Sequence, residues 1–220
     1  MIEIEPDQSW PQEFSQAAMS IGLATPRLEL EIEVLPTQNR LAEHSLALAA
    51  SVKNFESQEG ADAGTGRLVL LSDPGESFSW GGPFRIVCFA KSPLETELGA
   101  DGPISEVAWS WLIDALNDHQ AGFFNEAGTT TRIISTGHGA LAHHGDHAEL
   151  EIRASWTPTD GRIDRHFQAW QDLICMLSGL PPRQVNSVPA PVGSVQHSDV
   201  GEPEGANFDE KGPGSTSEIN

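Results

Sequence analysis

The chain has 220 residues, 38% of them hydrophobic, and its 32 acidic side chains against 12 lysines and arginines give a formal net charge of −20. This length suits one domain with a sizeable core. A surface this negative repels phosphate backbones and anionic membranes. The acidic N-terminus lacks the charge pattern of a secretory signal, and no apolar run is long enough to cross a bilayer. We therefore expect a cytoplasmic protein that binds neither nucleic acid nor membranes.

The first predicted element is a helix that begins at Ser9, its expected N-cap, and stops at Gly22. Its buried stripe is expected to consist of Phe14, Ala17, Ala18 and Ile21. Residues 27–35 (RLELEIEVL) alternate between apolar and acidic side chains, as a half-exposed strand does. The apolar face of that strand is predicted to hold Leu28, Leu30, Ile32 and Val34.

Three more strands are predicted before the second helix, around residues 46–55, from Arg67 (RLVLL), and over residues 84–91. A turn at residues 73–75 (DPG) separates the last two. The strand at 84–91 is apolar on both faces, which indicates a central position. Because the connections are too short for helical crossovers, the four strands should form an antiparallel meander.

The second helix is predicted to start at Pro103 with Asp101 as its cap, and the third to run over residues 163–178. Strands at 128–136 and 148–156 lie between them. The expected stripe of the third helix consists of Ile163, Phe167, Trp170, Ile174 and Leu177. The order α-β-β-β-β-α-β-β-α predicts an α+β fold, a twisted antiparallel sheet of about six strands with three helices packed mainly on one face.

Residues 1–182 are predicted to form this single domain, and residues 183–220 a disordered acidic tail rich in Gly, Pro and Ser. Cys88 and Cys175 each lie inside an apolar run and outside any C-x-x-C pair, so we expect buried free thiols.

Five segments stand out in one order between Ser9 and Pro182: residues 66–74 (GRLVLLSDP), 84–90 (FRIVCFA), 107–116 (VAWSWLIDAL), 151–158 (EIRASWTP) and 170–182 (WQDLICMLSGLPP). Together they resemble an actinobacterial family known only as a domain of unknown function, number three thousand. The resemblance implies a cytosolic protein, but no activity, cofactor or catalytic residue.

Four of the eight histidines lie within residues 137–150 (GHGALAHHGDHAEL). His144, Asp146 and His147 match three positions of the H-x-H-x-D-H signature of metallo-β-lactamase-like hydrolases, but Ala142 occupies the first position. Zinc needs three or four converging ligands, and few later histidines are left to complete the set. We expect a polar hairpin loop without a physiological metal; adventitious nickel or zinc binding and a true metal centre are the alternatives.

Arginines inside strand patterns are the second candidate site. Arg85, Arg132 and Arg153 could converge on the sheet face opposite the helices and bind an anion through paired hydrogen bonds. The structural interpretation is that they pair with cross-strand carboxylates such as Glu149 or Glu151, as cations in the strands of an acidic domain most often do, and the anion site is the sharper hypothesis.

Trp109 and Trp111 are candidate partner-binding residues. Two residues apart on a helix, they point in different directions, so one should pack on the sheet while the other is partly exposed.

No local motif for acyl transfer, P-loop phosphoryl transfer or zincin chemistry is present. The sequence therefore favours a non-catalytic binding or adaptor module, without a cofactor, whose partner is another protein or a small ligand. An enzyme with a site assembled from scattered residues is the alternative, including a metal-dependent hydrolase that uses the loop from His138 to His147.

Overall fold

A computed structural model describes residues 2–36, 42–53, 64–94 and 103–183. Six strands form one sheet in the order β1-β2-β3-β4-β6-β5, and every neighbouring pair is antiparallel. The strands are β1 (Leu30–Leu35), β2 (His44–Val52), β3 (Thr65–Ser72), β4 (Arg85–Leu94), β5 (Phe123–Thr136) and β6 (Asp146–Pro158). The predicted meander of four strands and the central position of β4 are confirmed.

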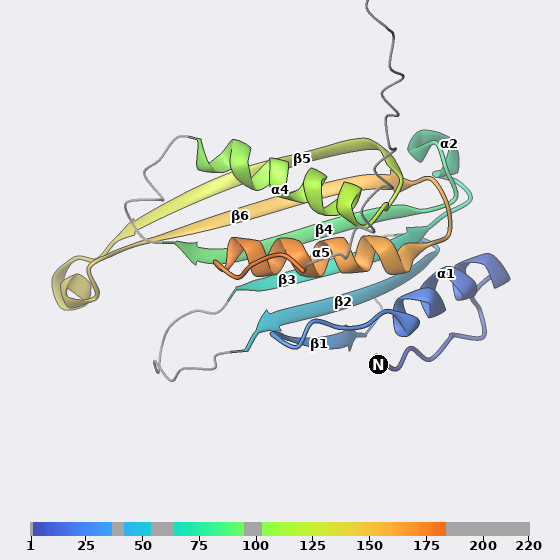
Figure 1. Ribbon diagram of the computed structural model, residues 1–220, viewed down its shortest axis with the longest axis horizontal. Coiled ribbons are helices and arrows are strands. Elements are labelled where there is room, and N and C mark those ends of the chain that lie inside the picture. The colour runs from blue at the N-terminus through green and yellow to red at the C-terminus, as the bar shows by residue number, and fades with distance from the viewer. Residues whose placement is uncertain (1, 37–41, 54–63, 95–102, 184–220) are drawn as a thin grey trace, which may run out of the picture. The chain divides into compact units, whose positions relative to one another are not determined.

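Three long helices lie on one face of the sheet (Figure 1). Helix α5 (Ile163–Leu177) packs on β2, β3 and β4, while α4 (Ile104–Asp118) packs on β5 and β6, and α1 (Gln12–Leu23) packs against α5. The predicted α+β architecture is therefore confirmed. The described part of the chain also contains a short helix, α2 (Ser77–Trp80), and a 3-10 helix, η1 (Gly139–His144), which local composition did not predict.

Helix α5 is the most deeply buried helix because it lies over the middle of the sheet and has α1 and α4 on its two sides. All five side chains of its predicted stripe are buried. Gly66 lets the helix approach β3, since a Cβ atom there would collide with Cδ1 of Ile174. The predicted buried stripe of α1 is confirmed as well.

Some local expectations differ from the structure. Leu28 is 83% exposed, because β1 begins only at Leu30 and the turn before it directs Arg27 into the interior instead. Ser9 does not cap α1: its backbone N–H and hydroxyl both donate to Asp7, and Pro11 precedes the helix. Helix α4 buries Leu112, whereas Val107 is 37% exposed.

Cys88 and Cys175 are free and buried, as predicted. The proposed cap Asp101 and residues 184–220 lie outside the described residues. No helix in the described ranges is long and apolar enough to cross a membrane.

Candidate functional site

The sheet face opposite the helices carries one row of side chains that can be followed through the register. Ala49 pairs with Arg67, Arg67 with Phe89, and Phe89 with Arg153, so these side chains project from the same face. A hollow of about 920 Å³ lies over this row. Glu31 and Glu33 of β1 also line it, so acids and arginines are equally represented among its charged side chains.

Arg153 and Arg85 on this face already make hydrogen bonds within the protein and lie far from each other. Arg153 donates to Glu151 over 2.5 Å, and its guanidinium carbon lies 5.5 Å from the centroid of the Phe89 ring. Arg85 donates to the backbone oxygen of Asn125 and to the hydroxyls of Thr157 and Ser155. Since Phe89, the register partner of Arg153, is four residues from Arg85, the two arginines stand roughly 13 Å apart along the strands.

Arg132 lies on the other face. It pairs with Leu150, which is fully buried on the helix side of the sheet. This placement corrects the expectation that Arg132 shares an anion-binding surface with Arg85 or Arg153, because a strand directs alternate side chains to opposite faces. The role of these arginines in ligand binding stays a prediction, and of Arg85, Arg132 and Arg153 only Arg153 is among the described residues that line the hollow.

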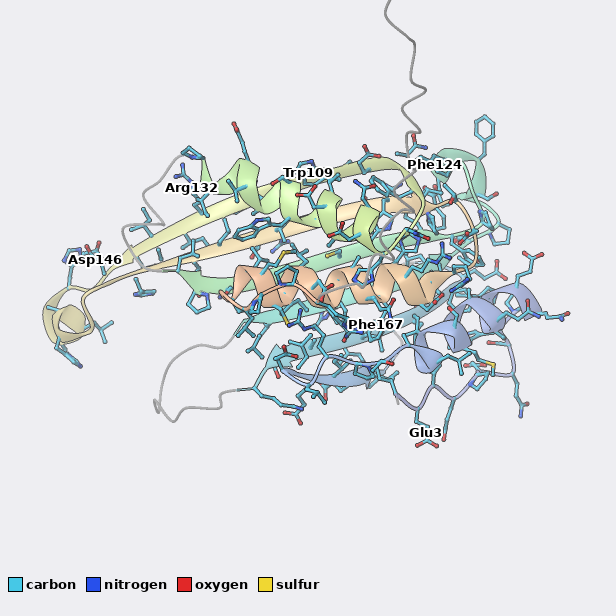
Figure 2. The ribbon with its side chains drawn as sticks, in the orientation of Figure 1. Glu3, Trp109, Phe124, Arg132, Asp146 and Phe167 are labelled. Carbon is cyan, nitrogen blue, oxygen red and sulfur yellow. The ribbon has the colours of Figure 1, made fainter. Side chains whose placement is uncertain are left out.

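The histidine-rich segment is the tip of the hairpin between β5 and β6, where η1 makes the turn (Figure 2). Asp146 and His147 are exposed neighbours at the start of β6 and pair with Thr136 and Ser135. As consecutive strand residues they point to opposite faces, which disfavours one shared metal ion. Within the described ranges no three His, Cys, Asp or Glu side chains are placed to hold a metal, and the side chain of His144 lies outside them.

The two tryptophans of α4 do point in different directions. Trp109 packs on β5 at Gly128, where a Cβ atom would stand 2.6 Å from Cζ3 of its indole ring. Trp111 instead turns toward α5 and is partly buried.

Trp111 forms one wall of a second hollow, of about 620 Å³, between α4, α5 and the segment that follows α5. This surface, which we call the Trp111 hollow, takes Asp114, Ala115 and Asp118 from α4; these lie three, four and seven residues after Trp111, on the same helix face. The rest of the lining consists of Asp172, Met176, Gly179, Leu180, Pro181 and Pro182.

Asp172 belongs to a buried polar cluster beneath the Trp111 hollow. Arg27 donates to Oδ1 of Asp172 over 2.8 Å, and Nε2 of His119 lies 2.6 Å from Oδ2. The side chains of all three residues are at most 6% exposed. Burial acts to raise the pKa of Asp172, but the hydrogen bonds from His119 and Arg27 outweigh it and hold that pKa below its ordinary value.

Arg27 also holds the ends of several elements together. It donates to Glu29 over 2.6 Å and to the backbone oxygen of Pro181 over 2.9 Å, while its own N–H donates to Gln171. Sequence reasoning missed this cluster. One signal was present, because Gln171 and Asp172 interrupt the apolar run of α5 (WQDLIC), and polar residues on a buried helix face need partners.

This cluster has the character of a structural device rather than of a catalytic one. Both oxygens of Asp172 are engaged, and neither cysteine is activated, because burial raises the pKa of Cys88 and raises that of Cys175 to about 11. Another buried imidazole, that of His166 on α5, accepts a hydrogen bond from Nε1 of Trp156 and has a pKa lowered by burial to about 4.

Comparison with known proteins gives one match. Residues 10–186 match the family described as protein of unknown function (DUF3000). The chain belongs to this family. The resemblance noted from the five sequence segments is thereby confirmed, and the family's description assigns no activity. No curated protein and no solved structure matches the chain.

Proposed function

We propose that this member of DUF3000 is a non-catalytic binding module that captures a basic segment of a partner protein in the Trp111 hollow. The observation that carries the proposal is the composition of that hollow. It combines an indole ring and apolar side chains with the carboxylates of Asp114 and Asp118, and no lysine or arginine of the described ranges lines it. A basic side chain with an apolar stem or neighbour is the complementary ligand.

The two exposed carboxylates support a cationic ligand in particular. Asp114 and Asp118 lie one helical turn apart, where like charges repel each other. Neither has an ion-pair partner among the described residues. A cation seated between them relieves the repulsion, and the face of Trp111 adds a cation–π contact.

The overall charge favours the same ligand class. A net charge of −20 attracts cations and repels anions at long range. The larger hollow on the open sheet face is lined by Glu31 and Glu33 and by Arg67 and Arg153, so its charges favour neither a cationic nor an anionic ligand. The Trp111 hollow is therefore the better supported site.

The test is a titration of the full chain with the capped tripeptide acetyl-Leu-Arg-Leu-amide, followed through the NMR signals of the tryptophan indole N–H groups. The signal that disappears in a Trp111→Phe variant identifies Trp111 and should shift on binding. Asp114→Asn combined with Asp118→Asn should weaken binding by about tenfold or more, equivalent to about 1.4 kcal/mol. Acetyl-Leu-Gln-Leu-amide should bind far more weakly.

Glu3→Gln combined with Glu5→Gln is the matched control, because both residues are exposed near the N-terminus and their loss changes the net charge by the same amount. This variant should bind the tripeptide nearly as well as the wild type does. Equal weakening in both double variants would show that only the overall charge attracts the peptide, and the proposed site would then be rejected.

A further inference from the structure

The outer edge of β5 is the longest strand edge without a partner in the described sheet. β5 has 14 residues and stands last in the strand order, whereas the opposite edge strand, β1, has six. An unpaired edge presents a row of backbone N–H and C=O groups that can pair with another strand. Proteins that keep such an edge single usually interrupt it with prolines or several charges.

The stretch Glu126 to Arg132 (EAGTTTR) contains no proline, and its only charges are the acid at its start and the base at its end. The residues between them are alanine, glycine and threonine, and all but Thr130 in the stretch are exposed. Small neutral side chains allow a second strand to approach closely. The register irregularity between Phe124 and Ala127 interrupts the regular ladder, so Glu126, at its C-terminal side, is the first residue of β5 that such pairing can include.

The charges at the two ends are complementary to those of a second copy of the same strand. If two β5 strands pair antiparallel about Thr129, Glu126 of each copy stands opposite Arg132 of the other, so one twofold axis creates two ion pairs. A parallel arrangement would instead place like charges side by side.

The sheet register agrees with this pairing. Arg132 projects to the helix side with Leu150, and Glu126 lies in the bulge opposite Trp156, whose buried side chain also faces the helices. Residues that stand opposite each other in an antiparallel pair share one face. We infer that β5 is a homodimer interface, in which residues 126–132 of two copies pair antiparallel about Thr129 to join their sheets.

This interface is independent of the Trp111 hollow, because none of its residues lines that hollow. The experiment is sedimentation velocity with light scattering on the full chain over a range of concentrations, with melting curves to verify folding. The wild type should reach the mass of a dimer. Glu126→Arg or Arg132→Glu alone sets two pairs of like charges opposite each other and should raise the dimer Kd by about tenfold or more.

The double variant Glu126→Arg with Arg132→Glu restores both ion pairs with their signs exchanged, so it should dimerise again. Glu31→Arg on β1 and Arg67→Glu on β3 make the same charge changes at exposed strand positions away from β5 and should leave the dimer unchanged. A monomer at every concentration, single variants that dimerise like the wild type, or a double variant that stays monomeric would each overturn the inference.

Discussion

His166 shows how one buried side chain makes the stability of this fold depend on pH. Its ring is fully buried, and Nδ1 accepts a hydrogen bond from Trp156, so the neutral ring carries its proton on Nε2. That nitrogen has no hydrogen-bond partner among the described residues. Protonation would add a buried charge, and burial therefore lowers the pKa of His166 from 6.5 to about 4.

The consequence is a loss of stability in mild acid. Below about pH 6.5 the unfolded chain binds a proton at His166, whereas the folded chain binds it only near pH 4. The free energy of unfolding therefore decreases as the pH is lowered from 6.5 towards 4. Over this interval we expect a loss of about 3 kcal/mol from this residue. Urea unfolding measured along a pH series should show it.

His166→Gln should flatten this pH dependence while it keeps an acceptor for Trp156. The diagnostic quantity is the slope of the unfolding free energy against pH, because the variant can be less stable at every pH. An unchanged slope would mean that His166 is not the group that titrates. The carboxyl of Asp172, whose pKa is lowered, contributes stability that is lost only at still lower pH, below about 4.

At the scale of elements, the cluster of Arg27, His119 and Asp172 joins the turn before β1, the end of α4 and the middle of α5. The contact of Arg27 with the backbone of Pro181 adds the segment after α5. This segment forms part of the Trp111 hollow, so the cluster fixes the geometry of the proposed binding site.

Arg27→Met should destabilise the fold by about 3–5 kcal/mol, because it leaves the buried carboxylate of Asp172 without its cation. Adding Asp172→Asn should recover part of that loss. Arg162→Met is the control, since the pair of Arg162 with Asp164 is exposed and its removal should leave the unfolding free energy nearly unchanged. If the losses of unfolding free energy from the two single substitutions simply add in the double variant, Arg27 and Asp172 are not energetically coupled and the prediction is wrong.

One face of the sheet carries the long helices, and the described polar contacts that position the Trp111 hollow lie on that side. Backbone contacts divide the chain into one unit that ends at Val185 and a second that covers residues 186–220. The composition of the second unit, rich in Gly, Pro, Ser and acids, offers no apolar period with which to build a core.

Deletion of residues 186–220 should therefore leave the melting temperature nearly unchanged. The shortened chain keeps Arg183, which donates to the backbone oxygen of Thr25. Differential scanning calorimetry of both chains is the measurement. A fall of more than about 5 °C, which corresponds to more than about 1 kcal/mol for a domain of this size, would show that the deleted segment stabilises the fold.

The elements whose signal is local could be predicted from the sequence. The stripes of α1 and α5, the four-strand meander and the hairpin around the histidines follow from periods of 3.6 and two and from turn residues, which act over a few positions. The start of β1 was predicted less accurately. Leu28 and Leu30 both fit the alternation of apolar and acidic residues, and only the packing shows that Leu30 is buried and Leu28 is exposed.

Which elements contact one another could not be predicted from the sequence and is seen only in the folded chain. In the fold, β6 lies between β4 and β5, and Arg132 and Arg153 lie on opposite faces of the sheet. Arg27 contacts Asp172, which is 145 residues away in the sequence. The candidate site could be predicted only in part: Trp111 was identified from its helix, whereas its neighbours on α5 were not. The physical reason is that such contacts depend on how helices dock on a twisted sheet, and this docking is set by the packing of the whole core rather than by any local pattern.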